Sequence, residues 1–197
     1  MGIFNFFFGS NNKVLKNEKS PYLTYKKDPK EIQFAQNFTN KGGKFIFSEN
    51  KDQTLSFFNQ ILTENAWSTS DLKSESSNLN SFFKIDTKPN LVKNNKYITQ
   101  VLSCEYLIAN KGSILICSHQ IKNYKLDELP ENIIIFAGVS QFASDVSEAM
   151  SMINSKYKEN LPTNITTLNA FNQNEEEDFL SYGSCTKNLY LIVQEDF

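Results

Sequence analysis

The chain has 197 residues and a mass of 22.6 kDa, a length that supports one α/β domain. With 40% hydrophobic residues, 21% charged residues and a net charge of −2, it is neither fibrous nor disordered, and it lacks the basic excess typical of nucleic-acid-binding proteins. All 20 basic residues are lysines, so an anion site has to use lysine, hydroxyl groups and backbone amides in place of arginine.

The N-terminal segment predicts neither export nor a membrane span. The apolar stretch 3–8 is too short for the core of a signal peptide or for a bilayer crossing. We expect residues 1–27 to form an arm and linker that packs on this or a neighbouring subunit, with weak attachment to a membrane surface as the alternative. Residues 28–197 are then expected to form a single domain.

The cysteines favour a reducing compartment. They form an odd, widely spaced set: Cys104, Cys117 and Cys185. Such a set argues against a secreted disulfide framework, and we therefore expect a cytoplasmic protein.

Alternating strand and helix patterns run through the first half. A helix is expected from Asp28, which begins a capping box, to the Gly42-Gly43 pair. Further elements are expected in chain order: a strand at 44–47, a helix at 52–67, a short helix within 68–80, a strand at 82–85 and a loop at 87–96.

The second half carries stronger patterns. The continuous apolar run 133–137 is typical of a strand buried on both faces of a parallel sheet. The other elements expected are a strand at 98–103, a hairpin of 105–109 with 113–117, a helix at 140–157, and strands at 165–168 and 188–193. Together the elements predict an α/β fold with an open, mostly parallel sheet flanked by helices.

Two loops near strand ends have the composition of an anion site. Residues 109–113 and 182–187 combine Gly-Ser backbone amides, hydroxyl groups and lysine, which can bind a phosphate or carboxylate. We predict that the two loops bind one small anionic metabolite. The residues of this predicted site are Asn110, Lys111, Gly112, Ser113, Gly183, Ser184, Thr186 and Lys187. Tight turns that merely enter strands are the alternative interpretation.

A few single residues could carry chemistry. Glu105, at a strand end, is a candidate catalytic carboxylate, with a structural hydrogen-bonding role as the alternative. His119 could act as a general base, and Cys185 as a nucleophile activated by Lys187.

Metal and cofactor signals are weak. A zinc site of Cys104, Cys117, His119 and Cys185 is formally possible, but structural zinc ligands usually come in close pairs, so we expect no metal. The chain also carries no nucleotide-binding fingerprint, and we expect no cofactor.

The second half resembles a known family. The segment from Cys104 to Ile116 is similar to the "IAeTGT/S-hydrophobic" segment of the LUD family, the lactate-utilisation proteins of the LutC and YkgG type. The segment from Tyr182 to Val193 is similar to the closing stretch of the family. The resemblance covers residues 97–197, and its overall form is closest to small LUD-domain proteins of the Bacteroidetes type.

The resemblance implies a NagB/RpiA/CoA-transferase-like fold and a role in oxidising lactate, or a related hydroxy acid, to pyruvate beside an iron–sulfur partner subunit. Asn110 and Lys111 replace an acid and a threonine of the family pattern, and its closing histidine, proline and arginines are missing. We therefore expect an accessory, metabolite-binding protein. The alternatives are a non-catalytic interaction subunit, with a possible homo-oligomer, or an enzyme of CoA-transferase or sugar-phosphate-isomerase type that uses Glu105.

Overall fold

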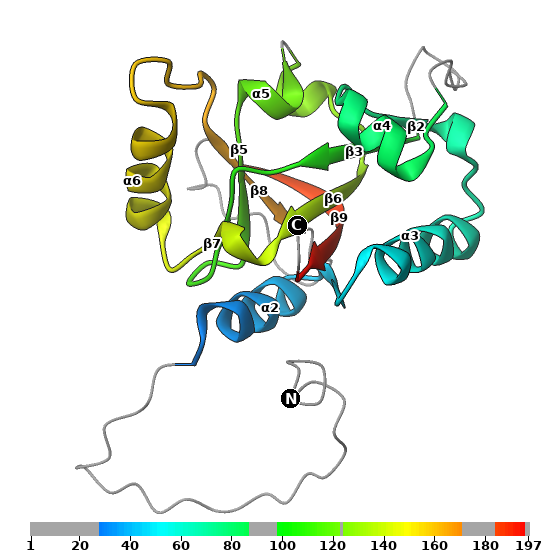
Figure 1. The fold of residues 1–197 in the computed structure, drawn as a ribbon, viewed down its shortest axis with the longest axis horizontal. Coiled ribbons are helices and arrows are strands. Elements are labelled where there is room, and N and C mark those ends of the chain that lie inside the picture. Colours follow the sequence, from blue (N-terminus) through cyan, green and yellow to red (C-terminus); the bar gives the residue numbers. More distant parts are fainter. Residues whose placement is uncertain (1–27, 87–97, 123, 171–183, 196–197) are drawn as a thin grey trace, which may run out of the picture.

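Helices lie on both sides of a central sheet in the computed structural model, which describes residues 28–86, 98–122, 124–170 and 184–195 (Figure 1). The helices are α2 Lys30–Asn40, α3 Lys51–Glu64, α4 Ser77–Phe83, α5 Ser118–Ile121 and α6 Val146–Tyr157. The strands are β1 Lys44–Ser48, β2 Leu72–Lys73, β3 Thr99–Ser103, β4 Tyr106–Ile108, β5 Ser113–Ile116, β6 Asn132–Gly138, β7 Phe142–Ala143, β8 Thr166–Ala170 and β9 Ser184–Gln194. None of the described helices has the length and hydrophobicity that crossing a bilayer requires.

The described strands form one nine-stranded sheet. Its order is β2-β3-β6-β9-β8-β5-β4-β7, and β1 pairs with the second half of β9. Pairing is antiparallel in β4–β5 and β5–β8 and parallel in the other described pairs. The predicted fold class, a mostly parallel sheet flanked by helices, is thus confirmed.

Strand β6 connects two of the apolar clusters. Ile133 and Ile135 point into the cluster that holds α2, whereas Ile134 and Phe136 point into the cluster that holds α3 and α4. All four side chains are at most 1% exposed, and each such burial stabilises the fold by roughly 1.5–3 kcal/mol. A strand that is buried on both faces therefore has a continuous apolar sequence, as residues 133–137 indicated.

Helix α6 covers the hairpin of β4 and β5. Ala149 and Ile153, one helical turn apart, are fully buried against Ile108 and Leu115. The helix begins after Asp145, whose side chain accepts a hydrogen bond from the backbone N–H of Glu148. This packing brings the C-terminal end of α6 to the end of the hairpin where β4 begins.

Three details of the predicted elements were wrong. The capping box at Asp28 is not formed, because the N-cap of α2 is Pro29 and no side chain caps it. Residues 82–83 belong to helix α4, not to a strand, since Leu79 and Phe83 bury the same helical face. The helix expected from residue 140 begins at Val146, because the preceding residues form a 3-10 turn and strand β7.

Among the other elements of the described chain, β1, α3, β3 and the hairpin follow the prediction closely. Strand β2, which holds the Leu72 expected in a short helix, and helix α5 were not predicted. Two expected features, the arm at 1–27 and the loop at 87–96, lie outside the described residues.

Candidate functional site

Glu105 lies at the carboxyl end of β3, in the short link to β4. Its backbone N–H donates to the carbonyl of Leu115 at 2.8 Å, which extends the hairpin pairing by one residue. The side chain of Gln141 donates to the carbonyls of Cys104 at 2.6 Å and Glu105 at 3.2 Å. The backbone is therefore fixed on both sides, and the carboxylate points into the protein.

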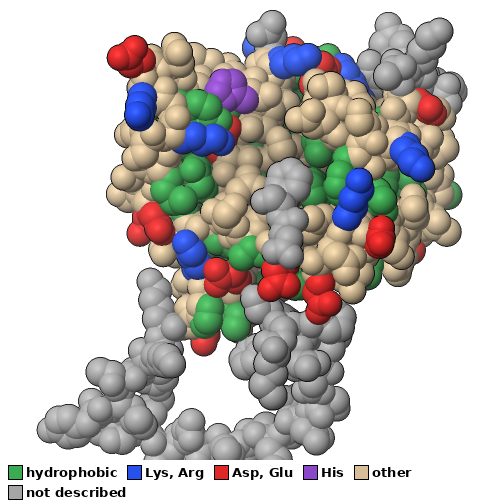
Figure 2. Space-filling view, viewed as in Figure 1, with side chains coloured by type: hydrophobic (Ala, Val, Ile, Leu, Met, Phe, Trp, Pro, Cys, Tyr) green, Lys and Arg blue, Asp and Glu red, His purple; other side chains and the backbone are tan. Residues whose placement is uncertain are grey.

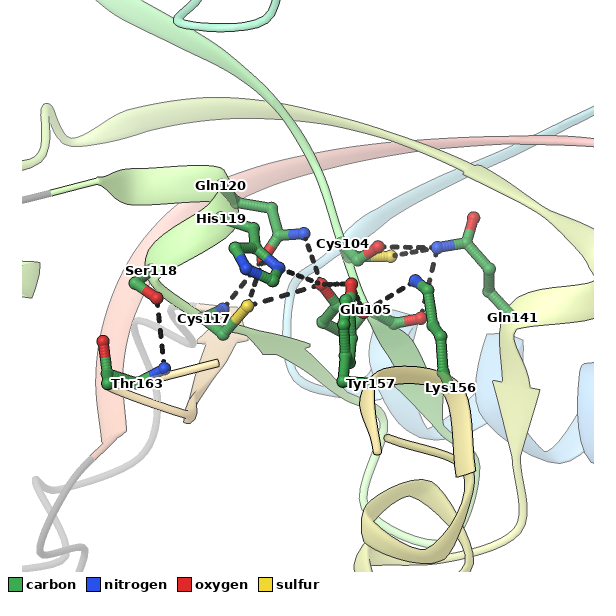
Figure 3. A network of polar contacts seen from close by, with 10 residues as sticks. All are labelled: Cys104, Glu105, Cys117, Ser118, His119, Gln120, Gln141, Lys156, Tyr157 and Thr163. Carbon is green, nitrogen blue, oxygen red and sulfur yellow. Dashed lines mark hydrogen bonds and ion pairs between the residues drawn. The ribbon is translucent and has the colours of Figure 1, made fainter. Parts of the chain in front are cut away.

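The Glu105 carboxylate accepts hydrogen bonds from two parts of the chain, residues 117–120 and 156–157 (Figure 3). Its Oε1 accepts from Gln120 Nε2 at 2.8 Å and from the Tyr157 hydroxyl at 2.9 Å. Its Oε2 accepts from Lys156 Nζ at 3.0 Å and again from Tyr157 at 3.0 Å. The Cys117 thiol donates to Oε1 at 3.3 Å, and His119 Nδ1 lies 3.8 Å from the same oxygen.

Local structure explains how these donors converge. Cys117 is the N-cap residue of α5, and its backbone N–H donates to Gln120 Oε1 at 2.9 Å, which turns the amide of Gln120 toward Glu105. Lys156 and Tyr157 form the last two residues of α6. The rings of His119 and Tyr157 lie 4.9 Å apart, so the two helix ends meet above the carboxylate.

Hydrogen bonding determines the charge of the site. Burial alone would raise the pKa of Glu105, but the hydrogen bonds from Gln120, Lys156 and Tyr157 outweigh it and hold the pKa below its ordinary value. For Lys156, burial works against the ammonium form, yet bonding to Tyr157 and Glu105 raises its pKa. Burial and the nearby Glu105 charge raise the pKa of Cys117 to about 11. At neutral pH the site thus holds a carboxylate, an ammonium group and a neutral thiol.

The site has a buried floor and an exposed rim. The Glu105 side chain is 1% exposed, whereas the side chains of Lys156 and His119 are 51% and 47% exposed. In Figure 2 the histidine, which is the only one in the chain, reaches the surface beside lysine side chains. A small polar molecule from solvent would therefore meet the ammonium and imidazole groups first and the carboxylate beneath them. We call Glu105, Cys117, His119, Gln120, Lys156 and Tyr157 the Glu105 cluster.

The first predicted anion loop is a packed turn. Asn110 and Lys111 are exposed at its tip, and the Asn110 N–H donates to the Ser144 carbonyl at 3.0 Å. Gly112 has a φ of +57° and lies against the backbone of α2. The Ser113 hydroxyl is buried and has no hydrogen-bond partner among the described residues.

The second predicted loop lies at the start of β9. Lys187 is 4% exposed, and its Nζ donates to the Leu129 carbonyl at 3.1 Å and lies 3.5 Å from Glu131 Oε1. Ser184 and Thr186 belong to β9, while Gly183 lies outside the described residues. Strand β8 separates β5 from β9 in the sheet, so Ser113 and Thr186 are not on neighbouring strands.

The zinc ligands considered from sequence are only partly brought together. Cys117 and His119 lie beside Glu105, which was not considered as a ligand, and the three ligand atoms fall within 4.8 Å of one another. Cys104 is instead buried in an apolar cluster, where Gln141 contacts its sulfur. Of Cys185 the structure describes only the backbone.

The sequence singled out Glu105, Cys117 and His119, but not the other members of the Glu105 cluster. Nothing in the sequence marked Gln120, Lys156 and Tyr157 as members of a site, because polar residues at the end of a helix are usually exposed to solvent. The one usable signal was the spacing of Cys117 and His119, which places two potential ligands one residue apart directly after a buried strand.

Comparison with known proteins agrees with this fold. The chain is similar to the crystal structure of a DUF162 family protein from Deinococcus radiodurans, with a TM-score of 0.58 and 14% sequence identity over 84% of this chain and 96% of that chain. No curated protein matches the chain. The family model described as the LUD domain matches residues 32–193, which include every residue of the Glu105 cluster. The chain therefore belongs to the LUD domain family and is related, in general terms, to lactate-utilisation proteins.

Proposed function

We propose that the protein serves lactate utilisation as a metabolite-binding component and that the Glu105 cluster binds a 2-hydroxy acid or 2-oxo acid such as lactate or pyruvate. The observation that carries the proposal is the buried Glu105 carboxylate beneath the half-exposed Lys156 and His119. Family membership supports the metabolic context.

The chemistry of the site suits such an acid. The ammonium group of Lys156 supplies the charge that a substrate carboxylate needs, and the Tyr157 hydroxyl lies next to it. The anionic Glu105 can accept a hydrogen bond from a 2-hydroxyl group. His119, 3.8 Å from Glu105, is placed to receive a proton from the bound molecule.

The wider setting is part of the proposal. We assign the electron-transfer step of lactate oxidation to an iron–sulfur partner subunit and place the protein in the cytoplasm, with homo-oligomer formation as a further possibility. We treat residues 28–197 as one LUD-like domain after an arm at 1–27, which the family match over 32–193 supports. The anion site at loops 109–113 and 182–187 stays a prediction of the sequence.

A second candidate function is an enzyme in which Glu105 forms a covalent thioester, as in CoA-transferase chemistry. The anionic state of Glu105 at a strand end favours this function, whereas its 1% exposure disfavours attack on an acyl-CoA. Formation of a hydroxylamine-sensitive glutamyl adduct with acyl-CoA would support it. Unchanged activity of Glu105→Gln would exclude it.

The remaining alternative, a non-catalytic interaction subunit, rests on the altered first family motif at Asn110 and Lys111 and on the phenylalanine-rich residues 1–10. Deleting residues 1–10 should then disrupt a dimer or partner complex, which light scattering would report as a fall in mass far larger than that of the ten deleted residues. An unchanged mass would remove the arm from that account.

The proposed function is tested by ligand-induced thermal stabilisation. L-lactate, D-lactate, glycolate and pyruvate are compared with chloride at equal ionic strength, since a ligand of the native state raises the melting temperature. At least one acid should raise the melting temperature of the wild type and of Lys158→Met, the matched control that removes the same charge just after α6. The same acid should have no effect on Lys156→Met, and equal stabilisation of both variants would contradict the proposal.

A further inference from the structure

Three potential metal ligands of the Glu105 cluster lie within 4.8 Å of one another: Glu105, Cys117 and His119. From this geometry we infer that they form a binding site for a single divalent transition-metal ion of the zinc type, with one coordination position open toward solvent. The inference does not depend on the proposed function, because it concerns the metal alone.

The distances between ligand atoms fit such an ion. In a tetrahedral zinc site with ordinary bond lengths, neighbouring ligand atoms are separated by about 3.3–3.5 Å. Here Cys117 Sγ is 3.3 Å and His119 Nδ1 is 3.8 Å from Glu105 Oε1. The third pair of ligand atoms, from Cys117 and His119, also lies within 4.8 Å, and the half-exposed His119 side chain has room to rotate toward the other two ligands.

The ligand types also match. Thiolate, imidazole and carboxylate are the three groups that proteins use for zinc, and three protein ligands with a free fourth position are typical of zinc sites that act on a bound molecule. Cys117 and Glu105 are buried, whereas His119 lies at the rim, so the open position faces the surface. Binding replaces the Cys117 S–H bond by a metal–sulfur bond, and the thiol proton passes to solvent.

The other members of the Glu105 cluster have opposing effects on metal binding. Gln120 and Tyr157 donate to the carboxylate and orient it, as outer partners commonly do for a metal ligand. The Lys156 ammonium, 3.0 Å from Oε2, repels a cation, but its flexible side chain is 51% exposed and can turn away. Removing this charge is therefore expected to strengthen metal binding.

The test uses full-length protein without a polyhistidine tag, stripped of metal by a chelator and titrated with Co²⁺. We expect one ion per chain and a thiolate-to-cobalt charge-transfer band that Zn²⁺ removes by competition. Cys117→Ser should lose the band, and His119→Ala should weaken binding by at least about tenfold. Cys104→Ala and Cys185→Ala should keep the band, and Lys156→Met should bind several-fold more tightly.

Circular dichroism checks that each variant is folded, and the exposed His119→Ala keeps the test informative where a buried variant unfolds. A wild type with no thiolate–cobalt band, or a band that persists in Cys117→Ser, would overturn the inference. The outcome is separable from that of the proposed function. Lys156→Met is expected to lose the response to the organic acid while gaining affinity for the metal.

Discussion

Glu105 illustrates how a buried acid acquires its properties from its neighbours. A carboxylate that is 1% exposed would ordinarily become neutral, but donors from α5 and α6 keep it charged. The charge is therefore as much a property of Gln120, Lys156 and Tyr157 as of Glu105 itself. Sequence reasoning could single out the acid at the strand end, but it could not find donors that only the packing of α6 brings into contact.

Lys187 is a second buried charged residue whose role depends on its hydrogen-bond partner, here a structural one. Its buried ammonium group donates to the Leu129 carbonyl, and Leu129 is 2% exposed. Lys187→Met should therefore lower the free energy of unfolding by about 1–2 kcal/mol, because that carbonyl loses its donor. The measurement is urea unfolding, with the exposed Lys111→Met as the control that should change stability by less than about 0.5 kcal/mol. Equal stability of Lys187→Met and wild type would show that the contact contributes nothing.

The ion pairs of Glu75 are expected to make the free energy of unfolding depend on pH. Its carboxylate lies 2.7 Å from the Nζ atoms of both Lys122 and Lys73, and hydrogen bonds from these two residues hold its pKa below the ordinary 4.5. Because the folded-state pKa is the lower one, this stabilisation is present above about pH 4.5 and is lost as the pH falls through the folded-state value.

In urea unfolding at several pH values, Glu75→Gln should therefore be less stable than wild type by about 1 kcal/mol at pH 7, with the difference vanishing in acid. The control is Glu159→Gln at an exposed position. A difference that stays constant with pH would argue against the ion pairs.

At the scale of elements, the contact between the hairpin turn and α2 leaves no space for a side chain. A Cβ atom at Gly112 would lie 2.4 Å from the Phe38 nitrogen, and its φ of +57° disfavours other residues. Gly112→Ala should lower the free energy of unfolding by more than about 2 kcal/mol, since backbone on both sides must shift. The neighbouring exposed Lys111→Ala is the control for chemical denaturation, and a Gly112→Ala protein as stable as that control would contradict the packing.

The elements also show how much of the fold was predictable. Strand β6 could be predicted because both of its faces are buried. Its apolar residues, Ile133 to Ala137, indicate a buried strand without any information about the elements that pack against them. The start of α6 could not be predicted, because Phe142 fits the helical spacing of the apolar α6 residues as well as it fits a strand. In the structure it pairs with β4 and packs against Phe34 from α2, a contact more than 100 residues distant in sequence. Tertiary contacts of this kind override local spacing.

At the scale of the whole molecule, the site lies where separate parts of the fold meet. The link β3–β4, the start of α5 and the end of α6 each contribute side chains, and each is held by different contacts, namely hairpin pairing, an N-cap turn and the α6 cluster. This convergence explains why the exposed rim and buried floor carry opposite charges at close range. It also explains why the predicted loops 109–113 and 182–187 were the more visible candidates in the sequence, since their residues are contiguous.

The central claim is that a small hydroxy or oxo acid binds at the Glu105 cluster, and Tyr157 reports on it directly. The measurement is NMR of protein labelled with ¹³C in the tyrosine rings, with the Tyr157 signal assigned by Tyr157→Phe, during titration with L-lactate and pyruvate. The account predicts a saturable shift of the Tyr157 signal with either acid and no comparable shift of Tyr190 or Tyr124. Saturable shifts confined to other tyrosines, or no shift at all, would contradict it.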